Sequence, residues 1–559
     1  YDSLRANTTY TIDFSDAIED NNEGNPMGQY TFSFSTGDVI DTMQVSGRVL
    51  NAADLEPIKG IMVGLYPADS TWNDTLFRTR PFLRVSRTNG EGRFTIKGVK
   101  DGAYRVRALE DKDGDFVFSQ KNERVAFDTM VYVTGSFPDV RMDTVWRDSL
   151  WYDSIRVVPY THYTPDDVLL LAFLEDGQER HLLKTVYPEP TNFTFYFTAP
   201  SDSTPRIKGL NFYERCLVAD ASLKNDTVTF WVTDTALIHR QDTLSMILSY
   251  METDTLGQLV VTNDTLDLSP KTTYAKIAAE RSKQIEAWEK DRERRQKKAK
   301  KPLPYEENPY ERIWLEAGFK PSGSLAPNQN VRYLAKEPIL EVDTTKIHFY
   351  VKKDTDWLPA PFLFMPEERS AKSYMLYAEW EPGQKYRFVM DTAAVVSVLE
   401  HESKYVRQEF HVRAVEEYGS IFIHVISPDT GVVVQLLSKN DKVEAQQRTD
   451  KDGNADFFFM KPGEYYMRCY VDANGNGQWD TGDYASGLQP ERVYYFGKPL
   501  PLKAQWDLRQ DWDIRAVDVA RQKPMAITKQ KPDKEKKLKN RNAERDREMQ
   551  RGQKQSTRR

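Results

Sequence analysis

Apolar and polar residues alternate with a period of two along most of the chain. Tyr30, Phe32 and Phe34 occupy every second position of residues 30–37, and residues 226–233 alternate in a similar way. Side chains of an extended strand point to opposite faces in turn, so this pattern predicts strands with one buried face. Asp-Thr pairs recur at the turns between such runs in residues 136–268. We therefore expect a mainly β protein.

Two strand-rich stretches repeat each other at a constant offset of 361 residues. Tyr104 of the first stretch corresponds to Tyr465 of the second, and Asp111 corresponds to Asp472. Both stretches have the same order of turn, strand, tight turn, strand and acidic loop, without a gap. The repeat indicates one β-sandwich module used twice, which is typical of scaffolds and adhesive surfaces.

The periodicity changes after residue 268. Ser269 and Pro270 favour a helix start, with Ser as the N-cap and Pro at the first helical position. Apolar residues then follow at helical spacing: Tyr274, Ile277, Ala278, Ile285 and Trp288. Basic residues crowd the end of the segment before Pro302 stops it. The helix is either a linker or an insertion in a discontinuous domain, and the sequence does not choose between them.

Length and charge add two further expectations. A chain of 559 residues is too long for one core and divides into several domains. Its net charge is −7, but residues 521–559 carry fifteen Lys/Arg against five Asp/Glu, so the body is acidic and the end is basic. Residues 516–559 have little to bury and are expected to form a disordered basic tail. The tail is either a solvated end or a site for anionic lipid or lipopolysaccharide.

Several features bear on the compartment. No stretch approaches the eighteen or so apolar residues of a membrane helix. The chain starts at Tyr1 within strand-like sequence, so we expect an export signal or lipid anchor to precede it. Cys216 and Cys469 fall in different predicted domains, which favours two buried thiols over a disulfide.

The repeated stretches carry a family resemblance. Residues 45–50, 61–66, 92–96 and 100–108 resemble the transthyretin-like β-sandwich of carboxypeptidase regulatory domains and of Cna B-type repeats. Residues 30–37, which end in Phe-Ser-Thr-Gly, resemble the last strand of bacterial Ig-like domains. The combination is similar to Ig-like-domain proteins of Bacteroidota envelopes. This resemblance implies a multidomain envelope protein of the periplasm, outer membrane or cell surface, tethered as a lipoprotein.

Together, pattern and resemblance predict seven segments. They are the C-terminal part of an Ig-like domain (1–43), a transthyretin-like sandwich (44–135), an Ig-like β region (136–268), a charged helix (269–302), an Ig-like domain (303–417), a second transthyretin-like sandwich (418–515) and the basic tail (516–559).

The acidic loop of the second copy has the oxygen spacing of a twelve-residue calcium loop. Its candidate ligands are Asp472, Asn474, Asn476, Gln478 through its carbonyl, Asp480 and Asp483. Gly477 stands at the sixth position, where such loops turn sharply. The loop resembles that of dockerins, but a strand leads into it, so it is not an EF-hand. The alternative is a turn whose Asp and Asn side chains bond only their own backbone.

The first copy keeps Asp111, Asp113 and Asp115 but has Phe116 where the second copy has glycine. We expect this loop to be empty or weakly occupied, although three close carboxylates repel each other without a cation.

Nothing in the sequence points to catalysis. The seven histidines are scattered, and no nucleophile elbow, phosphate loop or dinucleotide fingerprint is present. The basic tail has no interleaved aromatic residues, so nucleic-acid binding is not expected. The leading hypothesis is a non-enzymatic envelope scaffold whose partners are envelope or outer-membrane proteins. A surface glycan- or substrate-binding protein of an uptake system is the alternative, and an enzyme with accessory sandwiches ranks third.

Overall fold

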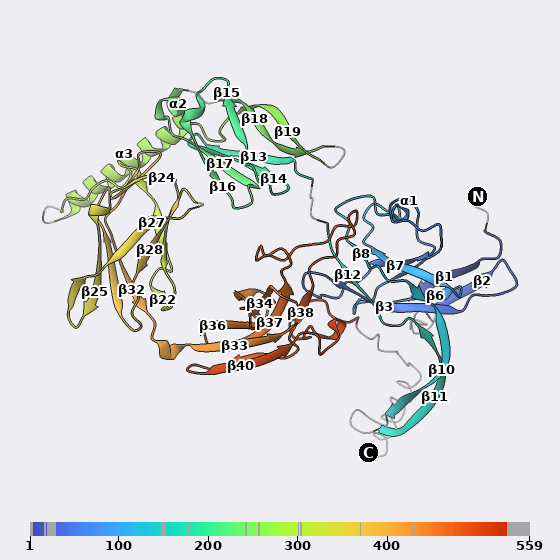
Figure 1. Cartoon of the computed structure of the whole chain (residues 1–559). Coiled ribbons are helices and arrows are strands. Elements are labelled where there is room, and N and C mark those ends of the chain that lie inside the picture. Colours follow the sequence, from blue (N-terminus) through green and yellow to red (C-terminus); the bar gives the residue numbers. More distant parts are fainter. Residues whose placement is uncertain are drawn as a thin grey trace, which may run out of the picture.

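The fold is described here from a computed structural model, shown in Figure 1. It describes residues 4–15, 18–19, 30–146, 152–175, 179–240, 243–254, 258–299, 301, 304–368, 370–427 and 429–533. Strands dominate and form several separate sheets, so the prediction of a mainly β chain is confirmed. No helix among the described residues is both long enough and apolar enough to span a membrane.

The first module is a sandwich of two sheets. One sheet has the order β12-β3-β6, with β12 parallel and β6 antiparallel to β3. The other has the order β5-β4-β7-β8, and β9 also pairs with β7. Its elements are β3 (Met43–Asn51), β4 (Met62–Pro67), α1 (Leu76–Thr79), β5 (Arg84–Arg87), β6 (Arg93–Val99), β7 (Ala103–Leu109), β8 (Val125–Phe127), β9 (Tyr132–Val133) and β12 (Val168–Ala172). Val45, Val63 and Val106 are among the buried residues that form its core.

The second module repeats this topology. Its sheets have the orders β36-β33-β40 and β35-β34-β37-β38, and β39 also pairs with β37. As in the first module, the last strand runs parallel to the first. Its strands are β33 (Gly419–Ile426), β34 (Val432–Leu437), β35 (Val443–Arg448), β36 (Asn454–Met460), β37 (Gly463–Val471), β38 (Val493–Tyr495), β39 (Leu500–Leu502) and β40 (Asp507–Asp513).

Equivalent side chains make the same hydrogen bonds in the two modules. The hydroxyls of Tyr104 and Tyr465 each donate to the carbonyl four residues earlier, at 2.8 and 2.7 Å. The Oδ1 atoms of Asn89 and Asp450 each accept from the backbone N–H groups two and four residues later. Shared topology and shared turn chemistry confirm the predicted duplication.

A long hairpin interrupts the first module and has no counterpart in the second. β10 (Gly135–Trp146) pairs with β11 (Tyr152–Thr164) and projects from the body (Figure 1), and β12 then returns to pair with β3. The boundary predicted at residue 135 is therefore wrong, because the last strand of the module lies inside the segment 136–268. The repeated motif ends at the acidic loop, so it contains no sign of this distant strand.

The two modules pack together through an aromatic cluster. Tyr484, from the loop between β37 and β38, is 5% exposed. Its ring centroid lies 5.1, 5.9 and 5.0 Å from those of Phe77, Phe118 and Phe127 in the first module. Its hydroxyl donates to the Asp74 carbonyl at 2.9 Å. A second apolar cluster joins Leu50 and Leu55 of the first module to residues of the second: Val433, Leu437, Tyr466, Tyr470, Val493 and Tyr495.

Residues 519–533, here called the strap, lie across both modules. Lys523 Nζ lies 2.8 Å from Glu56 Oε1 of the first module and 2.8 Å from Asp441 Oδ2 of the second. Ile527 is buried in the second shared cluster. The expectation of a disordered tail from residue 516 is wrong for this stretch, because one apolar side chain and a buried cation dock it. Residues 534–559, the rest of the expected tail, lie outside the described residues.

Two further sandwiches lie between the modules in the sequence. The first spans 182–268 and has sheets β13-β14-β17-β16 and β15-β18-β19. Its elements are β13 (Leu182–Glu189), β14 (Asn192–Phe197), β15 (Arg206–Gly209), β16 (Leu217–Ala221), β17 (Thr227–Val232), α2 (Thr235–Arg240), β18 (Leu244–Thr253) and β19 (Leu259–Leu268). Cys216 of this sandwich and Cys469 of the second module are buried free thiols, as predicted.

The second of these sandwiches spans 314–412. Its sheets have the orders β20-β31-β30-β24, β21-β23-β28-β27 and β22-β32-β29-β25-β26. Its strands are β20 (Trp314–Leu315), β21 (Ala317–Lys320), β22 (Ser324–Leu325), β23 (Val331–Ala335), β24 (Ile339–Val342), β25 (Ile347–Lys353), β26 (Asp356–Pro359), β27 (Phe362–Pro366), β28 (Ser373–Ala378), β29 (Lys385–Met390), β30 (Val395–Ser397), β31 (Glu402–Ser403) and β32 (Val406–Val412). A buried cluster of Trp231, Val398 and Leu399 joins the two sandwiches.

Helix α3 (Tyr274–Lys298) connects these two sandwiches. No described strand is shared between them, so α3 is a linker and not an insertion. The predicted start at Ser269 is wrong, since the backbone N–H groups of Lys271 and Thr272 bond the carbonyls of Tyr187 and Pro188 instead of starting the helix.

The N-terminal residues form a two-stranded ribbon beside the first module. β1 (Thr9–Ser15) pairs antiparallel with β2 (Tyr30–Ser35), which confirms the predicted strand at 30–37. The Arg84 guanidinium donates to the Thr9 carbonyl and holds the ribbon against the module.

Candidate metal centre

The acidic loop of the first module begins directly after β7. Asp111 Oδ1 accepts from the Gly114 N–H at 2.7 Å, and its Oδ2 accepts from the Phe116 N–H at 3.2 Å. These bonds wrap the backbone around the carboxylate. Gly114 and Phe116 adopt φ values of 83° and 62°, which only glycine reaches without strain. Phe116 thus adopts the positive φ that its counterpart in the second copy, Gly477, also adopts.

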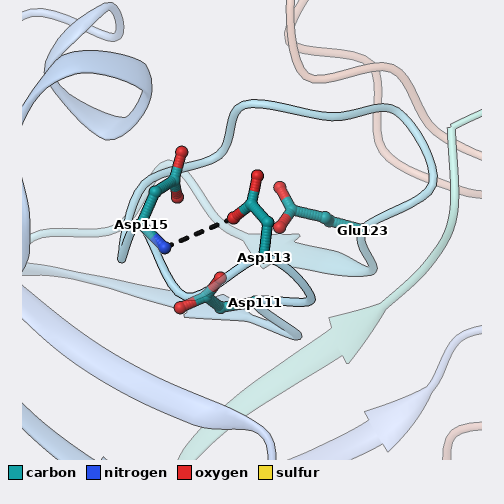
Figure 2. A group of neighbouring side chains, drawn as sticks. All are labelled: Asp111, Asp113, Asp115 and Glu123. Carbon is teal, nitrogen blue, oxygen red and sulfur yellow. Dashed lines mark hydrogen bonds between the residues drawn. The ribbon is translucent and has the colours of Figure 1, made fainter.

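Four carboxylates meet in this loop: those of Asp111, Asp113, Asp115 and Glu123. Each contributes an oxygen that lies within 4.8 Å of the others. Figure 2 shows the carboxylates of Asp113 and Glu123 side by side. Glu123 is fully buried and accepts from the backbone N–H groups of Lys112, Ser119 and Gln120. Among the residues described, no other group of His, Cys, Asp and Glu side chains is clustered this closely.

Within the described residues, no ion pair offsets the charge of this cluster. None of the four carboxylates forms an ion pair with a Lys or Arg in the described part of the chain. Burial acts to raise the pKa of Asp113, but hydrogen bonds from Asp115, Gln120 and Ser119 outweigh it, so the pKa is lowered. Asp113 therefore remains ionised at neutral pH and adds to the local negative charge.

The equivalent loop of the second module has the same turn around Asp472. Its Oδ1 accepts from the Gly475 and Asn476 N–H groups at 2.7 and 3.1 Å, and its Oδ2 accepts from Gly477 N–H at 3.0 Å. Arg448 Nη1 lies 3.4 Å from Asp472 Oδ2 and offsets its charge. The turn geometry of the two loops is thus the same, but their charge is not.

Four of the six residues predicted as ligands in this loop lie together. The side-chain amides of Asn474 and Asn476 donate to Asp480 Oδ2 at 2.5 and 2.8 Å, next to the Asp472 turn. The Gln478 N–H donates to Asn476 Oδ1 at 2.7 Å. Asp483 instead bonds the N–H and hydroxyl of Ser486, which lowers its pKa. The structure therefore engages Asp483 in a separate turn.

A glutamate in each loop was not expected from the sequence. Glu491 Oε1 accepts from the Ala473 N–H at 2.8 Å and its Oε2 from the Asp480 N–H at 3.1 Å. Glu123 holds the first loop in the same way, through the residue after Asp111. Burial raises the pKa of Glu491 despite these bonds.

A signal for these glutamates exists in the sequence. Both begin a Glu-Arg-Val tripeptide, at 123–125 and 491–493. The offset between the copies is 368 residues there and 361 at the start of the loops, because the second loop is seven residues longer. A comparison restricted to one constant offset therefore misses the tripeptide.

Both loops also supply aromatic residues to the interface between the modules. Phe118 lies inside the first loop and is fully buried, and Trp479 and Tyr484 lie inside the second. The Trp479 Nε1–H donates to the Glu491 carbonyl at 2.8 Å, which ties this ring to its own loop. The conformation of the acidic loops thus determines the positions of Phe118, Trp479 and Tyr484 in the interface.

Comparison with known proteins identifies one short region. Residues 1–36 match the family model described as a bacterial Ig-like domain. No curated protein matches the chain. The fold is that of a multidomain β-sandwich protein, and its residues 1–36 are similar to a bacterial Ig-like domain.

Similar solved structures are distant. The chain is 9% identical to BcpA, the major pilin subunit of Bacillus cereus, over 85% of this chain and 99% of that one, with a TM-score of 0.14. It is 11% identical to the MG0-NIE-MG1 domains of Escherichia coli alpha-2-macroglobulin over 58% of this chain and 98% of that one, with a TM-score of 0.20. The N-terminal part of the bacterial S-layer protein SbsC is 9% identical, over 29% and 42% of the chains, with a TM-score of 0.17.

Proposed function

We propose that this chain is a non-enzymatic scaffold of the bacterial cell envelope that presents Ig-like and transthyretin-like modules to partner proteins. The observation that carries the proposal is the packing of the two duplicated modules around Tyr484. Modules that are far apart in the sequence share a buried core there, so they form one base and not a string of independent domains. Such a base suits a protein whose task is to hold surfaces in fixed positions.

The strap supports the same conclusion. It contributes Lys523 to an ion-pair network in which Glu56 comes from the first module and Asp441 from the second. Their side chains are between 2 and 13% exposed. A charge pair buried to this extent is strongly destabilised when one partner is removed, so separating the modules is costly.

The bacterial Ig-like match over residues 1–36 supports an exported protein of the envelope. We propose that it is lipid-anchored and located in the periplasm or at the outer membrane, where its partners are other envelope proteins. Residues 534–559 carry eleven Lys/Arg against four Asp/Glu. We include anionic lipid or lipopolysaccharide as a ligand of this segment, because its charge attracts anionic surfaces.

The scaffold function is tested in the bacterium that encodes the chain. A tagged chain is cross-linked in intact cells, fractionated and purified with its partners. We expect it in the envelope fraction, with partners that are lost in a Tyr484→Ser variant and retained in a Tyr484→Phe control. A cytosolic location, or the same partners bound to both variants, would contradict the proposal.

We further propose that the two acidic loops bind calcium as structural sites. Asp111, Asp113, Asp115 and Glu123 offer a set of hard oxygen ligands without a balancing cation, which is the donor type that calcium prefers. In the second loop the ligands would be Asp472, Asn474, Asn476, Asp480 and the Gln478 carbonyl, with Glu491 supporting them. The sixth predicted ligand, Asp483, is held by Ser486 and would have to leave that turn to join them. The first loop has the higher negative charge, so we propose that it binds calcium more tightly than the second. This differs from the expectation, based on the sequence, of an empty or weakly occupied first loop.

The proposed role of calcium is to stiffen the interface between the modules. Each loop supplies interface aromatics, so a bound ion would hold Phe118 and Trp479 in position. Calorimetric titration of the chelator-treated chain with calcium tests this proposal. The result that would contradict it is no heat of binding and no change in melting temperature at millimolar calcium.

A further inference from the structure

A large groove lies between helix α3 and the sandwich of residues 314–412. Its volume is about 1140 Å³, above the roughly 300–1,000 Å³ typical of small-molecule pockets. One wall is a single face of α3 that carries Ile277, Glu280, Arg281 and Gln284. The opposite wall is the segment 309–319, which includes β20 and the start of β21. We call this space the α3 groove.

Two hydrogen bonds cross the α3 groove. The Arg281 guanidinium donates to the Tyr310 carbonyl at 2.8 Å and to the Glu311 carbonyl at 2.9 Å. These bonds fasten the helix to the opposite wall, so the groove belongs to a fixed junction between α3 and the sandwich.

Strand β21 presents unpaired backbone groups along this groove. It is the edge strand of the sheet β21-β23-β28-β27. Ala317 and Phe319 are opposite Ala335 and Tyr333, and the bond from Lys336 N–H to the Glu316 carbonyl sets the alternation of the ladder. In an antiparallel pair every second residue directs its N–H and C=O away from the partner strand. In β21 these residues are Ala317 and Phe319, and both line the groove.

The part of this edge that lines the groove carries no charge and no proline, and Lys320 and Pro321 stand at its end. Natural edges are blocked by charged residues, proline or bulges. Here the sequence across the groove is Ala317, Gly318 and Phe319, and a Cβ at Gly318 would meet no atom within 4 Å. The face of the strand at Gly318 is therefore open.

The lining of the groove mixes apolar and polar side chains, and its formal charges cancel. Tyr310, Ile313 and Tyr405 line the groove with 42, 47 and 57% of their surface exposed. The charged residues of the lining are three acids and three bases: Glu189, Glu280, Glu316, Arg281, Arg312 and Lys404. A balanced, partly apolar lining suits an uncharged ligand with apolar side chains.

We propose that the α3 groove binds an extended, uncharged segment of a partner polypeptide as an added strand on β21. The row of backbone donors and acceptors distinguishes a polypeptide from a glycan, because only a peptide backbone matches that spacing. The helical wall would then contact the side chains on one face of the added strand. This site goes beyond the scaffold function, which assigns no partner surface, and it is independent of the calcium loops.

The test begins with a random dodecapeptide phage library panned against the full chain. An enriched peptide is synthesised with a fluorophore, and its affinity is measured by fluorescence anisotropy. Ala317→Pro removes one outward N–H from the edge, and Ile277→Glu places a charge on the helical wall. Ala279→Glu adds the same charge at an exposed α3 position outside the groove lining and serves as the matched control.

We expect both groove variants to weaken peptide binding at least tenfold and the control to leave it unchanged. N-methylation of alternate peptide residues should weaken binding tenfold or more along one edge and have no effect along the other. Circular dichroism and the melting temperature establish whether Ala317→Pro is folded. If this variant is not folded, the peptide affinity of Ile277→Glu alone tests the proposal.

Three results would overturn the proposal. They are the absence of an enriched peptide, equal binding to wild type and groove variants, and equal sensitivity of both peptide edges to N-methylation. Binding of a neutral oligosaccharide such as maltoheptaose, lost in Ile277→Glu, would assign the groove to a glycan instead. None of these results alters the partner recovery expected for the Tyr484 variants, so the two proposals fail separately.

Discussion

The ring of Tyr484 in the second module meets that of Phe127 in the first edge to face, with centroids 5.0 Å apart and planes at 86°. This geometry is the preferred arrangement of two aromatic quadrupoles and adds to the area that the rings bury. The contact joins two copies of one module into a single body. The acidic loops and the strap both contribute buried side chains to the interface between the modules.

Replacing Tyr484 should separate the modules. Tyr484→Ala removes a ring that is 5% exposed and should cost about 3–5 kcal/mol, as for other large buried aromatics. Tyr484→Phe removes only the hydrogen bond to the Asp74 carbonyl and should cost about 1 kcal/mol. Urea unfolding monitored by tryptophan fluorescence measures both values. Equal stability of the two variants would show that the aromatic cluster does not hold the interface.

The strap should contribute to stability and the remaining tail should not. A chain ending at residue 518 loses Lys523 and Ile527, so its modules should melt at a lower temperature. A chain ending at residue 533 keeps every described strap contact and should melt like the full chain. Differential scanning calorimetry of the two truncations distinguishes them. An unchanged melting temperature for the shorter chain would refute the docking of the strap.

The ion pairs of Lys523 should make stability depend on pH at both extremes. Burial alone would lower the pKa of Lys523 and raise that of Glu56, but their interactions outweigh burial, so the pKa of Lys523 is raised and that of Glu56 is lowered. The contribution of Glu56 is present above its unfolded pKa of about 4.5 and is lost as pH falls through its lower folded value. The contribution of Lys523 is present below about 10.5 and is lost as pH rises through its higher folded value.

A Lys523→Ala variant checks this dependence. It leaves Asp441 and Glu56 without their cation in a buried site, so it should be less stable by about 3–5 kcal/mol at neutral pH. The difference from wild type should shrink as the pH falls through the lowered folded pKa of Glu56 and as it rises through the raised folded pKa of Lys523. Urea midpoints across this range measure it. A difference that is constant with pH would mean that Lys523 acts through packing of its alkyl chain alone.

Calcium should stabilise the chain through the acidic loops. With an affinity near 10⁻⁴ M, as for extracellular calcium modules, about 2 mM calcium should add about 1–2 kcal/mol per site. A double variant, Asp111→Asn with Asp113→Asn, should lose the first site, and Asp472→Asn should lose the second. Asp356→Asn, an exposed change on β26, is the control. A calcium-dependent melting shift that is as large in both loop variants as in the wild type would place the ion elsewhere.

Local features of the structure were predictable from the sequence. The strand at 30–37 follows from the alternation of apolar and polar residues. The matching turns at Asn89 and Asp450 and the turn around Asp472 depend on side chains that bond backbone groups two to five residues away. Such contacts are encoded in short spacing patterns. For the same reason the duplication was visible, because both copies preserve these turns at one offset.

Features that depend on distant segments were not predictable. The final strand of the first module follows an inserted hairpin and pairs with β3, far earlier in the chain. Glu123 and Glu491 stand outside the twelve-residue spacing, and Asp483, which fits that spacing, is held by Ser486. The helix start at Ser269 was locally favourable, but backbone bonds to Tyr187 and Pro188 prevail.

The sequence by itself determined the mainly β class, the duplicated module and the backbone turns of the acidic loops, because each follows from a period of two or from bonds within a few residues. Only the tertiary structure decided that the two modules share one core, that Lys523 joins Glu56 to Asp441, and that α3 faces an unpaired edge strand. These relationships depend on how surfaces pack after the sheets have formed. Packing of complementary shapes between distant segments has no period along the chain, so no local pattern records it.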